Sequence, residues 1–171
     1  MNIPNVSGCS SLAEATRIIL LSQEGVHEIG NTNSGPEVDE FNAAVNMPPG
    51  TSWCCAYLCW GVKNAAKQLN VTPQFQYGAS VFKLWTRNQS LILPGPQADC
   101  IMLRNEGISR FSGHAIGHAL WVLGVNDDTN LHVISGNTTA ADPNARTGGS
   151  VAIQNRPQSQ MSNGYGYIKL I

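Results

Sequence analysis

Residues 49–60 read Pro-Gly-Thr-Ser-Trp-Cys-Cys-Ala-Tyr-Leu-Cys-Trp, a loop that passes directly into an apolar run. Thr51 or Ser52 can cap a helix, because a short side-chain oxygen accepts a free N–H group of the first turn. A polar stripe at three- and four-residue spacing follows, which predicts a helix from about Trp53 to Leu69. Cys54 then lies in the first turn, where free N–H groups and the helix dipole favour the thiolate. Cys54 is therefore a candidate nucleophile.

The neighbouring cysteines are expected to have a structural role. Cys55 and Cys59 are four residues apart on one helical face and are expected to pack into the core. Buried cysteines usually behave as small hydrophobic residues, so the same role stays open for Cys54. The chain has five cysteines, and none of them has zinc-finger spacing. We therefore expect free thiols, no disulfide and no metal.

Length and composition exclude several classes of protein. The 171 residues suit one domain spanning 1–171, with a flexible segment at residues 1–10. The net charge of −1, with 12% charged residues, gives no basic footprint for nucleic acid. No run of 18 apolar residues predicts a membrane span. The N-terminal residues do not resemble a secretory signal, so synthesis in the cytoplasm without a signal peptide is expected, as a monomer.

The order of the expected elements predicts the fold class. Ser11 and Glu14 form a capping box before a helix that runs to about Glu24, and Pro36 suits the first position of a second helix. A short helix is also expected at 80–85, after the helix that begins near Trp53. Helices first and strands afterwards indicate an α+β fold, with N-terminal helices packed on a C-terminal antiparallel sheet of about five to six strands. The expected strands are Cys100–Arg104, His118–Val125, Leu131–Ser135, Gly149–Gln154 and Tyr165–Leu170.

Two histidines are candidates for a base beside Cys54. His114 and His118 are four residues apart in a glycine-containing, β-rich segment, and this context argues against a zinc site on a helix. A turn at 126–128 would lay Asn137 opposite the neighbourhood of His118. There the Asn137 carboxamide oxygen could accept a ring N–H and fix the histidine tautomer. A structural histidine and a simple turn asparagine remain the alternatives.

Three segments together resemble the CHAP-type cysteine amidohydrolases/peptidases of the NlpC/P60-like, papain-like superfamily. Residues 53–60 resemble the family motif PWCAAFVSW, residues 117–125 are similar to GHVGIVVGV, and residues 135–138 are similar to GGNQ or EGNT. The resemblance implies a papain-like fold in which Cys54 is the nucleophile, His118 the base and Asn137 the orienting residue.

The chain also departs from the family pattern. Ser52 stands at the usual proline, Cys55 at the usual alanine and Leu120 at a usual glycine. A second Gly-His pair at 113–114 keeps His114 open as a rival base. No aspartate cluster precedes Cys54, so neither a calcium site nor another cofactor is expected. Candidates for substrate binding are Trp53, His114 and Ser135.

The resemblance implies a peptidoglycan hydrolase. The bond cut would be the N-acetylmuramoyl–L-alanine amide or an amide of the stem peptide or cross-bridge. Such an enzyme would act in the periplasm or cell wall of a target or host bacterium, as an interbacterial toxin or a phage endolysin. A toxin would have a cognate immunity protein as partner. The alternatives are a non-catalytic wall-binding or phage structural module on the same fold, and a cysteine hydrolase acting on a protein amide.

Overall fold

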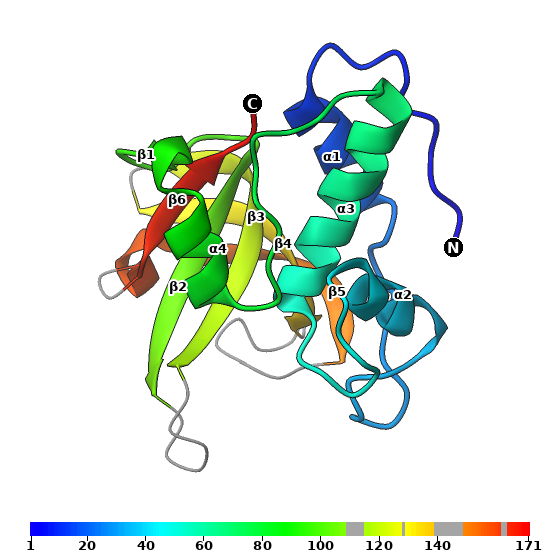
Figure 1. Cartoon of the computed structure of the whole chain (residues 1–171). Helices are drawn as coiled ribbons and strands as arrows, with labels where there is room; N and C mark the ends of the chain where they lie inside the picture. The colour runs from blue at the N-terminus through cyan, green and yellow to red at the C-terminus, as the bar shows by residue number, and fades with distance from the viewer. Residues whose placement is uncertain (109–114, 128, 139–148, 162–163) are drawn as a thin grey trace.

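The computed structural model describes residues 1–108, 115–127, 129–138, 149–161 and 164–171 (Figure 1). Within these residues the fold is α+β, as predicted, with four α-helices and one six-stranded antiparallel sheet. The sheet has the strand order β1-β6-β2-β3-β4-β5. The four helices all precede the sheet in the chain, so helical and strand-forming sequence are segregated as expected.

The helices begin close to where the capping residues predict. The Ser11 hydroxyl accepts from the Glu14 N–H at 3.1 Å, and Pro36 is the first residue of its helix. The first helix ends three residues before the predicted end, because turns follow it and lead to Gly25, which has φ +85°. The observed helices are α1 (Leu12–Leu21), α2 (Pro36–Ala44), α3 (Cys54–Leu69) and α4 (Val81–Arg87).

The start of α3 differs from the prediction in its cap. The N-cap residue is Trp53 and makes no capping hydrogen bond through its side chain. The Thr51 hydroxyl donates instead to the Pro48 carbonyl, and Ser52 does not cap the helix either. The proposed caps were therefore wrong, although the helix starts within one residue of the predicted position.

All five predicted strands are present, and most are longer than predicted. The sheet also contains the short strand β1, which the sequence pattern did not reveal. β3 begins before Gly117 and pairs with β4, and the pair nearest their connection is Asp127 and Asn130, so Asn126 and Asp127 of the expected turn belong to β3. The strands are β1 (Ile92–Leu93), β2 (Cys100–Ile108), β3 (Ala115–Asp127), β4 (Asn130–Thr138), β5 (Ser150–Pro157) and β6 (Gly166–Lys169).

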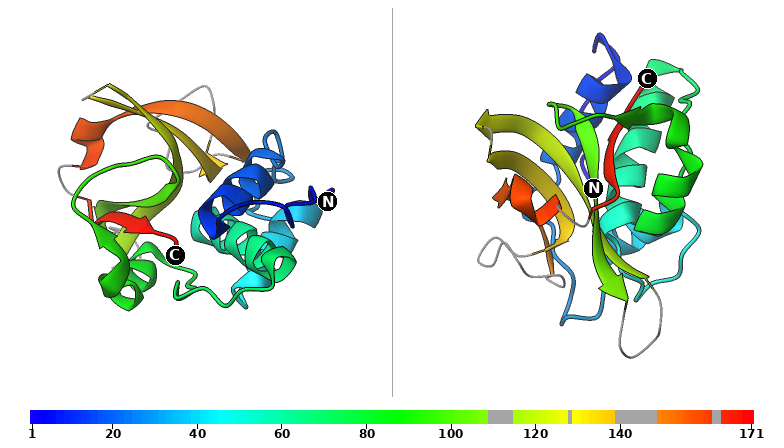
Figure 2. Two further views of the ribbon diagram at one scale, coloured as in Figure 1. Left: turned by 90° about the horizontal axis from the view of Figure 1, so that it is seen from above. Right: turned by 90° about the vertical axis from the view of Figure 1, so that its left-hand side faces the viewer.

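Two hydrophobic clusters form on the two faces of the sheet. In β3, Ala119, Trp121 and Leu123 pack in the larger cluster with the helices, whereas Leu120 and Val122 belong to the second cluster on the opposite face. Seen from above, the strands follow a curve, and α1, α2 and α3 gather at one side of it (Figure 2). This alternation assigns His118, two residues before Leu120, to the face away from the helices.

The N-terminal segment contacts the helices, whereas a flexible segment was expected at residues 1–10. Val6 is buried, and its N–H donates to Gln68 Oε1 at 2.8 Å. The Gln68 amide donates in turn to the Pro4 carbonyl at 2.9 Å. Across the described ranges, no helix combines the length and apolar character that crossing a membrane requires.

Candidate active site

Cys54 is the first residue of α3, and the helix presents free donors around it. The first intrahelical bond at this end runs from the Tyr57 N–H to the Trp53 carbonyl, at 2.9 Å. The N–H groups of Cys54, Cys55 and Ala56 therefore have no acceptor within the helix. These donors and the positive end of the helix dipole favour negative charge at this position.

The surroundings of Cys54 lower its pKa well below the usual range of a thiol. The largest cause is a hydrogen bond with the Cys55 thiol, followed in the same direction by the hydrogen bond and positive charge of His118 and by the Ala119 backbone N–H. Burial opposes these effects, since it disfavours the charged form. The hydrogen bonds and the charge outweigh burial, so the net effect on Cys54 is a lowered pKa.

The pKa values of the other four cysteines are raised. The Cys55 pKa is raised because its thiol is hydrogen-bonded to Cys54 and is buried. Burial also raises the pKa of Cys59 to about 12 and that of Cys100 to about 11, and desolvation raises the pKa of Cys9. All five cysteines are free, and Cys54 is the one among them whose pKa is lowered.

A gap between β3 and β4 brings the sheet to Cys54. The β3–β4 ladder ends at the pair Trp121 and Ile134, and Ala119 lies two residues beyond this end. The Ala119 N–H therefore has no ladder partner on β4, and it donates to the Cys54 sulfur instead. His118 precedes Ala119 and is paired with Arg104 of β2, which fixes its position on the strand. The end of this ladder thus brings Cys54 and His118 together.

Asn137 lies level with His118 on the neighbouring strand. Both residues are three positions beyond the last ladder pair, Trp121 and Ile134, and two register shifts lie between that pair and the pair Asp127 and Asn130. The expected ring hydrogen bond is not formed, since His118 Nε2 has no hydrogen-bond partner among the described residues. Asn137 has φ +56° and lies in a β-bulge where the β4–β5 pairing skips residues between Ser135 and Thr138.

Gly136 allows β4 to approach the first turn of α3. A Cβ atom there would lie 2.5 Å from Cζ3 of Trp53 and 3.0 Å from Cβ of Tyr57, distances that only glycine avoids. The Trp53 ring stacks on Phe41 with centroids 5.7 Å apart, and its Nε1 donates to Glu28 Oε2 at 3.2 Å. The start of α3 is therefore fixed against the strand that carries Asn137.

Two of the three proposed substrate contacts are fully buried in this structure. The Trp53 side chain is fully buried between aromatic neighbours and β4, so it helps to place the helix and presents no surface to a ligand. Ser135 is fully buried as well, on β4. His114, the third candidate and the rival base, lies outside the described residues. Of the proposed triad, Cys54 is 7% exposed, His118 2% and Asn137 3%, so the nucleophile is the most accessible of the three.

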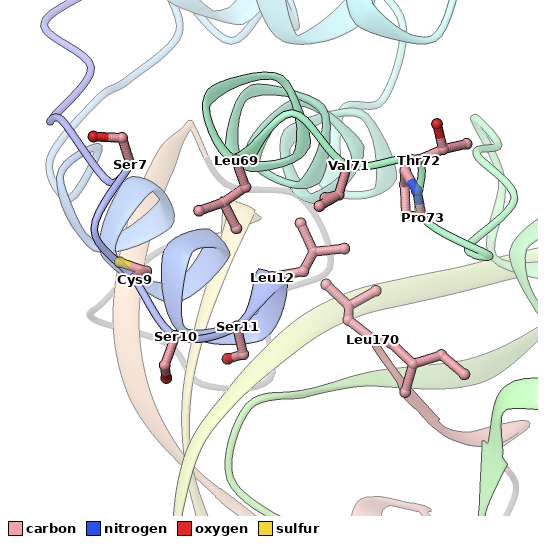
Figure 3. A pocket seen from close by; sticks show the side chains of 11 residues that line it. Ser7, Cys9, Ser10, Ser11, Leu12, Leu69, Val71, Thr72, Pro73 and Leu170 are labelled. Atoms are coloured by element: carbon pink, nitrogen blue, oxygen red, sulfur yellow. The ribbon is translucent and has the colours of Figure 1, made fainter.

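A large cavity of the molecule lies away from Cys54. It has a volume of about 650 Å³ and lies where the far end of α3 meets α1 and the C-terminal residues (Figure 3). Leu69, in its lining, is fifteen residues from Cys54, which is roughly 22 Å along a helix. A smaller pocket of about 330 Å³ is lined by residues 25–27, Ile29, Pro36 and Glu37. Among the described residues, no three His, Cys, Asp or Glu side chains are grouped so that they could hold a metal ion.

Sequence reasoning missed the residues that surround the proposed triad. Cys55 was expected to be only a core residue, and the sequence pattern did not indicate the hydrogen bond between its thiol and Cys54. A glycine directly before Asn137 was a visible signal of a close approach, but its partner Trp53 was not predictable. Glu28 gave no signal of its contact with Trp53, because the two residues are 25 positions apart.

Comparisons with known proteins add no support to the resemblance to the CHAP family, which depends on the three motifs. No family model, no curated protein and no solved structure matches this chain.

Proposed function

We propose that this chain is a papain-like cysteine hydrolase that cleaves an amide bond of bacterial peptidoglycan. The observation that supports the reaction type most strongly is the contact of Cys54, at the first position of α3, with the imidazole of His118. A thiolate beside a histidine at a helix N-terminus suits nucleophilic attack on a carbonyl. The choice of peptidoglycan as substrate rests on the resemblance of the three motifs to the CHAP family.

The proposed reaction uses these groups in two stages. The Cys54 thiolate attacks the amide carbonyl and forms a tetrahedral oxyanion, which the free N–H groups at the start of α3 are suited to stabilise. Protonated His118 gives its proton to the leaving nitrogen, so the C–N bond breaks and a thioester remains. Water then attacks the thioester while His118 accepts a proton from it. The second stage releases a carboxylic acid and restores the thiolate and the imidazolium.

Asn137 is proposed to orient the His118 ring. In the structure described, Nε2 of His118 is buried and has no partner among the described residues, while Asn137 lies level with it across the strands. A buried ring nitrogen without a partner is costly. A side-chain rotation that brings the Asn137 carboxamide to Nε2 would remove this cost and hold the ring toward Cys54.

The site of action belongs to the same proposal. We propose that the chain acts in the periplasm or wall of a target or host bacterium, as an injected toxin or as a phage endolysin. An injected toxin requires a cognate immunity protein in the producing cell, and the candidate active site is the surface such a partner would cover. A monomer is sufficient for the proposed reaction, because Cys54, His118 and Asn137 all come from one chain.

Digestion of purified sacculi tests the proposed function. The wild-type chain is expected to release soluble fragments, and Cys54→Ala is expected to release none. Mass analysis of the fragments then identifies the bond that was cut. Equal release by both proteins would overturn the role of Cys54. Binding of both proteins to sacculi without release would favour the wall-binding module, and activity only on protein amides would favour the third alternative.

A further inference from the structure

A buried polar network lies directly beside Asn137. Arg156 is 0% exposed, and its Nε and Nη2 donate to Gln154 Oε1 at 3.1 and 2.7 Å. Arg156 Nη2 also donates to Thr138 Oγ1 at 3.3 Å, and that hydroxyl lies 3.4 Å from the same Gln154 oxygen. Thr138 follows Asn137 in the chain, so the network acts on the residue next to the proposed orienting residue.

The network lies on the sheet face to which His118 is assigned. Arg156 and Gln154 pair with Leu131 and Val133 of β4, and these two residues belong to the hydrophobic cluster on the face away from the helices. His118 belongs to the same face by strand alternation. The network and His118 are therefore assigned to the same face of the sheet.

Both sequence neighbours of Asn137, Gly136 and Thr138, are fixed by contacts with other elements. On one side, Gly136 lies against the Trp53 ring at the start of α3. On the other side, the Thr138 hydroxyl accepts from Arg156, and the Thr138 carbonyl accepts from the Ser150 hydroxyl at 2.8 Å. Asn137 itself has a left-handed φ of +56°, a conformation that asparagine adopts more readily than most other non-glycine residues.

The buried arginine at this position is held by directed hydrogen bonds. Burying a guanidinium is costly, and apolar side chains of similar volume often fill such a space with equal or greater stability. Hydrogen bonds differ from apolar packing because they fix direction as well as position. The network therefore offers the bulge a defined orientation that apolar packing would not supply.

We propose that Arg156, acting through Thr138, is a positioning residue that sets the orientation of Asn137 and thereby of the His118 ring. The inference rests on the role given to Asn137 in the proposed function. It extends the site to β5, a strand that carries none of the proposed catalytic residues.

The test is a double-mutant cycle between Thr138→Val and Asn137→Ala, read by the alkylation rate of Cys54. Thr138→Val keeps the shape of the side chain and removes the hydroxyl. Each single variant is expected to slow alkylation at pH 6 by roughly three- to ten-fold, the effect of one lost hydrogen bond. Thr138→Val should add less than about two-fold in the Asn137→Ala background, because residues that act through one another are not additive.

Two further variants make the outcome decisive. Thr16→Val, the same change at a buried α1 hydroxyl that has no hydrogen-bond partner, should leave the alkylation rate unchanged. Arg156→Lys keeps the charge but changes the geometry of the donors, so it should slow alkylation as Thr138→Val does. It provides a second test of the network if Thr138→Val folds poorly. Additive effects in the cycle, or an equal effect of Thr16→Val, would overturn the inference. Alkylation needs no substrate, so failure to cleave sacculi would refute the proposed function without deciding this inference.

Discussion

The chemistry of the candidate site depends on one thiol among five. Cys54 and Cys55 are adjacent in the first turn of α3, yet their pKa values move in opposite directions. The difference arises because Cys54 also receives the Ala119 N–H and faces His118, whereas Cys55 is buried beside a sulfur that it can only donate to. Neighbouring donors therefore select the nucleophile in this pair.

The Cys55→Ala variant tests this selection. Because the hydrogen bond with Cys55 is the largest cause that lowers the Cys54 pKa, its loss should raise that pKa. A group with a lowered pKa loses its charged form as the pH falls through that pKa. The alkylation rate of Cys54 in Cys55→Ala should therefore decline at a higher pH than in the wild type.

Iodoacetamide labelling followed by peptide mass analysis measures both profiles. In the wild type, Cys54 should be labelled first at neutral pH, before the partly exposed Cys9, whose pKa is raised. Identical pH profiles for the wild type and Cys55→Ala would show that Cys55 does not stabilise the thiolate. Faster labelling of Cys9 or Cys55 would show that Cys54 is not the reactive thiol.

At the scale of secondary-structure elements, the junction of α3 with β4 organises the site. Gly136→Ala would place a Cβ atom 2.5 Å from the Trp53 ring, so the helix and the strand must separate. Overpacking of this kind typically costs about 1–3 kcal/mol of the free energy of unfolding. Gly124→Ala is the matched control in the adjacent strand, since a Cβ atom there meets nothing within 4 Å.

Urea denaturation of the two variants checks this prediction. Gly136→Ala should be destabilised by the stated amount, and Gly124→Ala should lie within about 0.5 kcal/mol of the wild type. Equal stability of the two variants would show that the contact between Gly136 and Trp53 does not constrain the fold.

The elements were largely predictable from local sequence, whereas their contacts were not. Ser11, Pro36 and the apolar alternation of β3 act within a few residues, so the helices and five strands followed from them. The cap of α3 was missed because Trp53 is held by Phe41 and Glu28 rather than by a local side chain. β1 was missed because a two-residue strand has no period to detect.

The candidate site was predictable only in part for the same reason. The positions of Cys54, His118 and Asn137 followed from a helix start, a strand and a hairpin register. The Arg156 network could not be predicted, because an alternating strand pattern does not tell a buried polar residue from an exposed one. The burial of Trp53 and Ser135 was not predictable either, because it depends on packing between distant segments.

At the scale of the whole molecule, the buried thiols should lower the free energy of unfolding as the pH becomes alkaline. The Cys59 pKa is about 12 and the Cys100 pKa about 11 in the folded chain, against about 8.5 for a thiol in an unfolded chain. Groups with raised pKa values contribute stability that is fully present below the unfolded pKa and is lost as the pH rises toward the folded pKa. Each thiol should remove up to about 1.4 kcal/mol per pH unit above pH 8.5.

Urea denaturation between pH 7.5 and 9.5 measures this loss. The wild-type free energy of unfolding should fall above about pH 8.5, and Cys59→Ala should show a shallower fall. Cys54, whose pKa is lowered, opposes this fall until the pH has passed the unfolded pKa of about 8.5, and it does so equally in the wild type and in Cys59→Ala. Equal slopes for the wild type and Cys59→Ala would contradict the proposed burial effect.

The most direct test of the proposed function is the initial rate of amide cleavage in sacculi for a set of histidine variants. His118→Ala should reduce the rate to the background given by Cys54→Ala, because the leaving nitrogen would lose its proton donor. His114→Ala should retain substantial activity, and His132→Ala, at a partly exposed β4 position that contacts Asn155, should match the wild type. Wild-type cleavage that persists in His118→Ala, or is lost in His114→Ala instead, would contradict the pairing of Cys54 with His118.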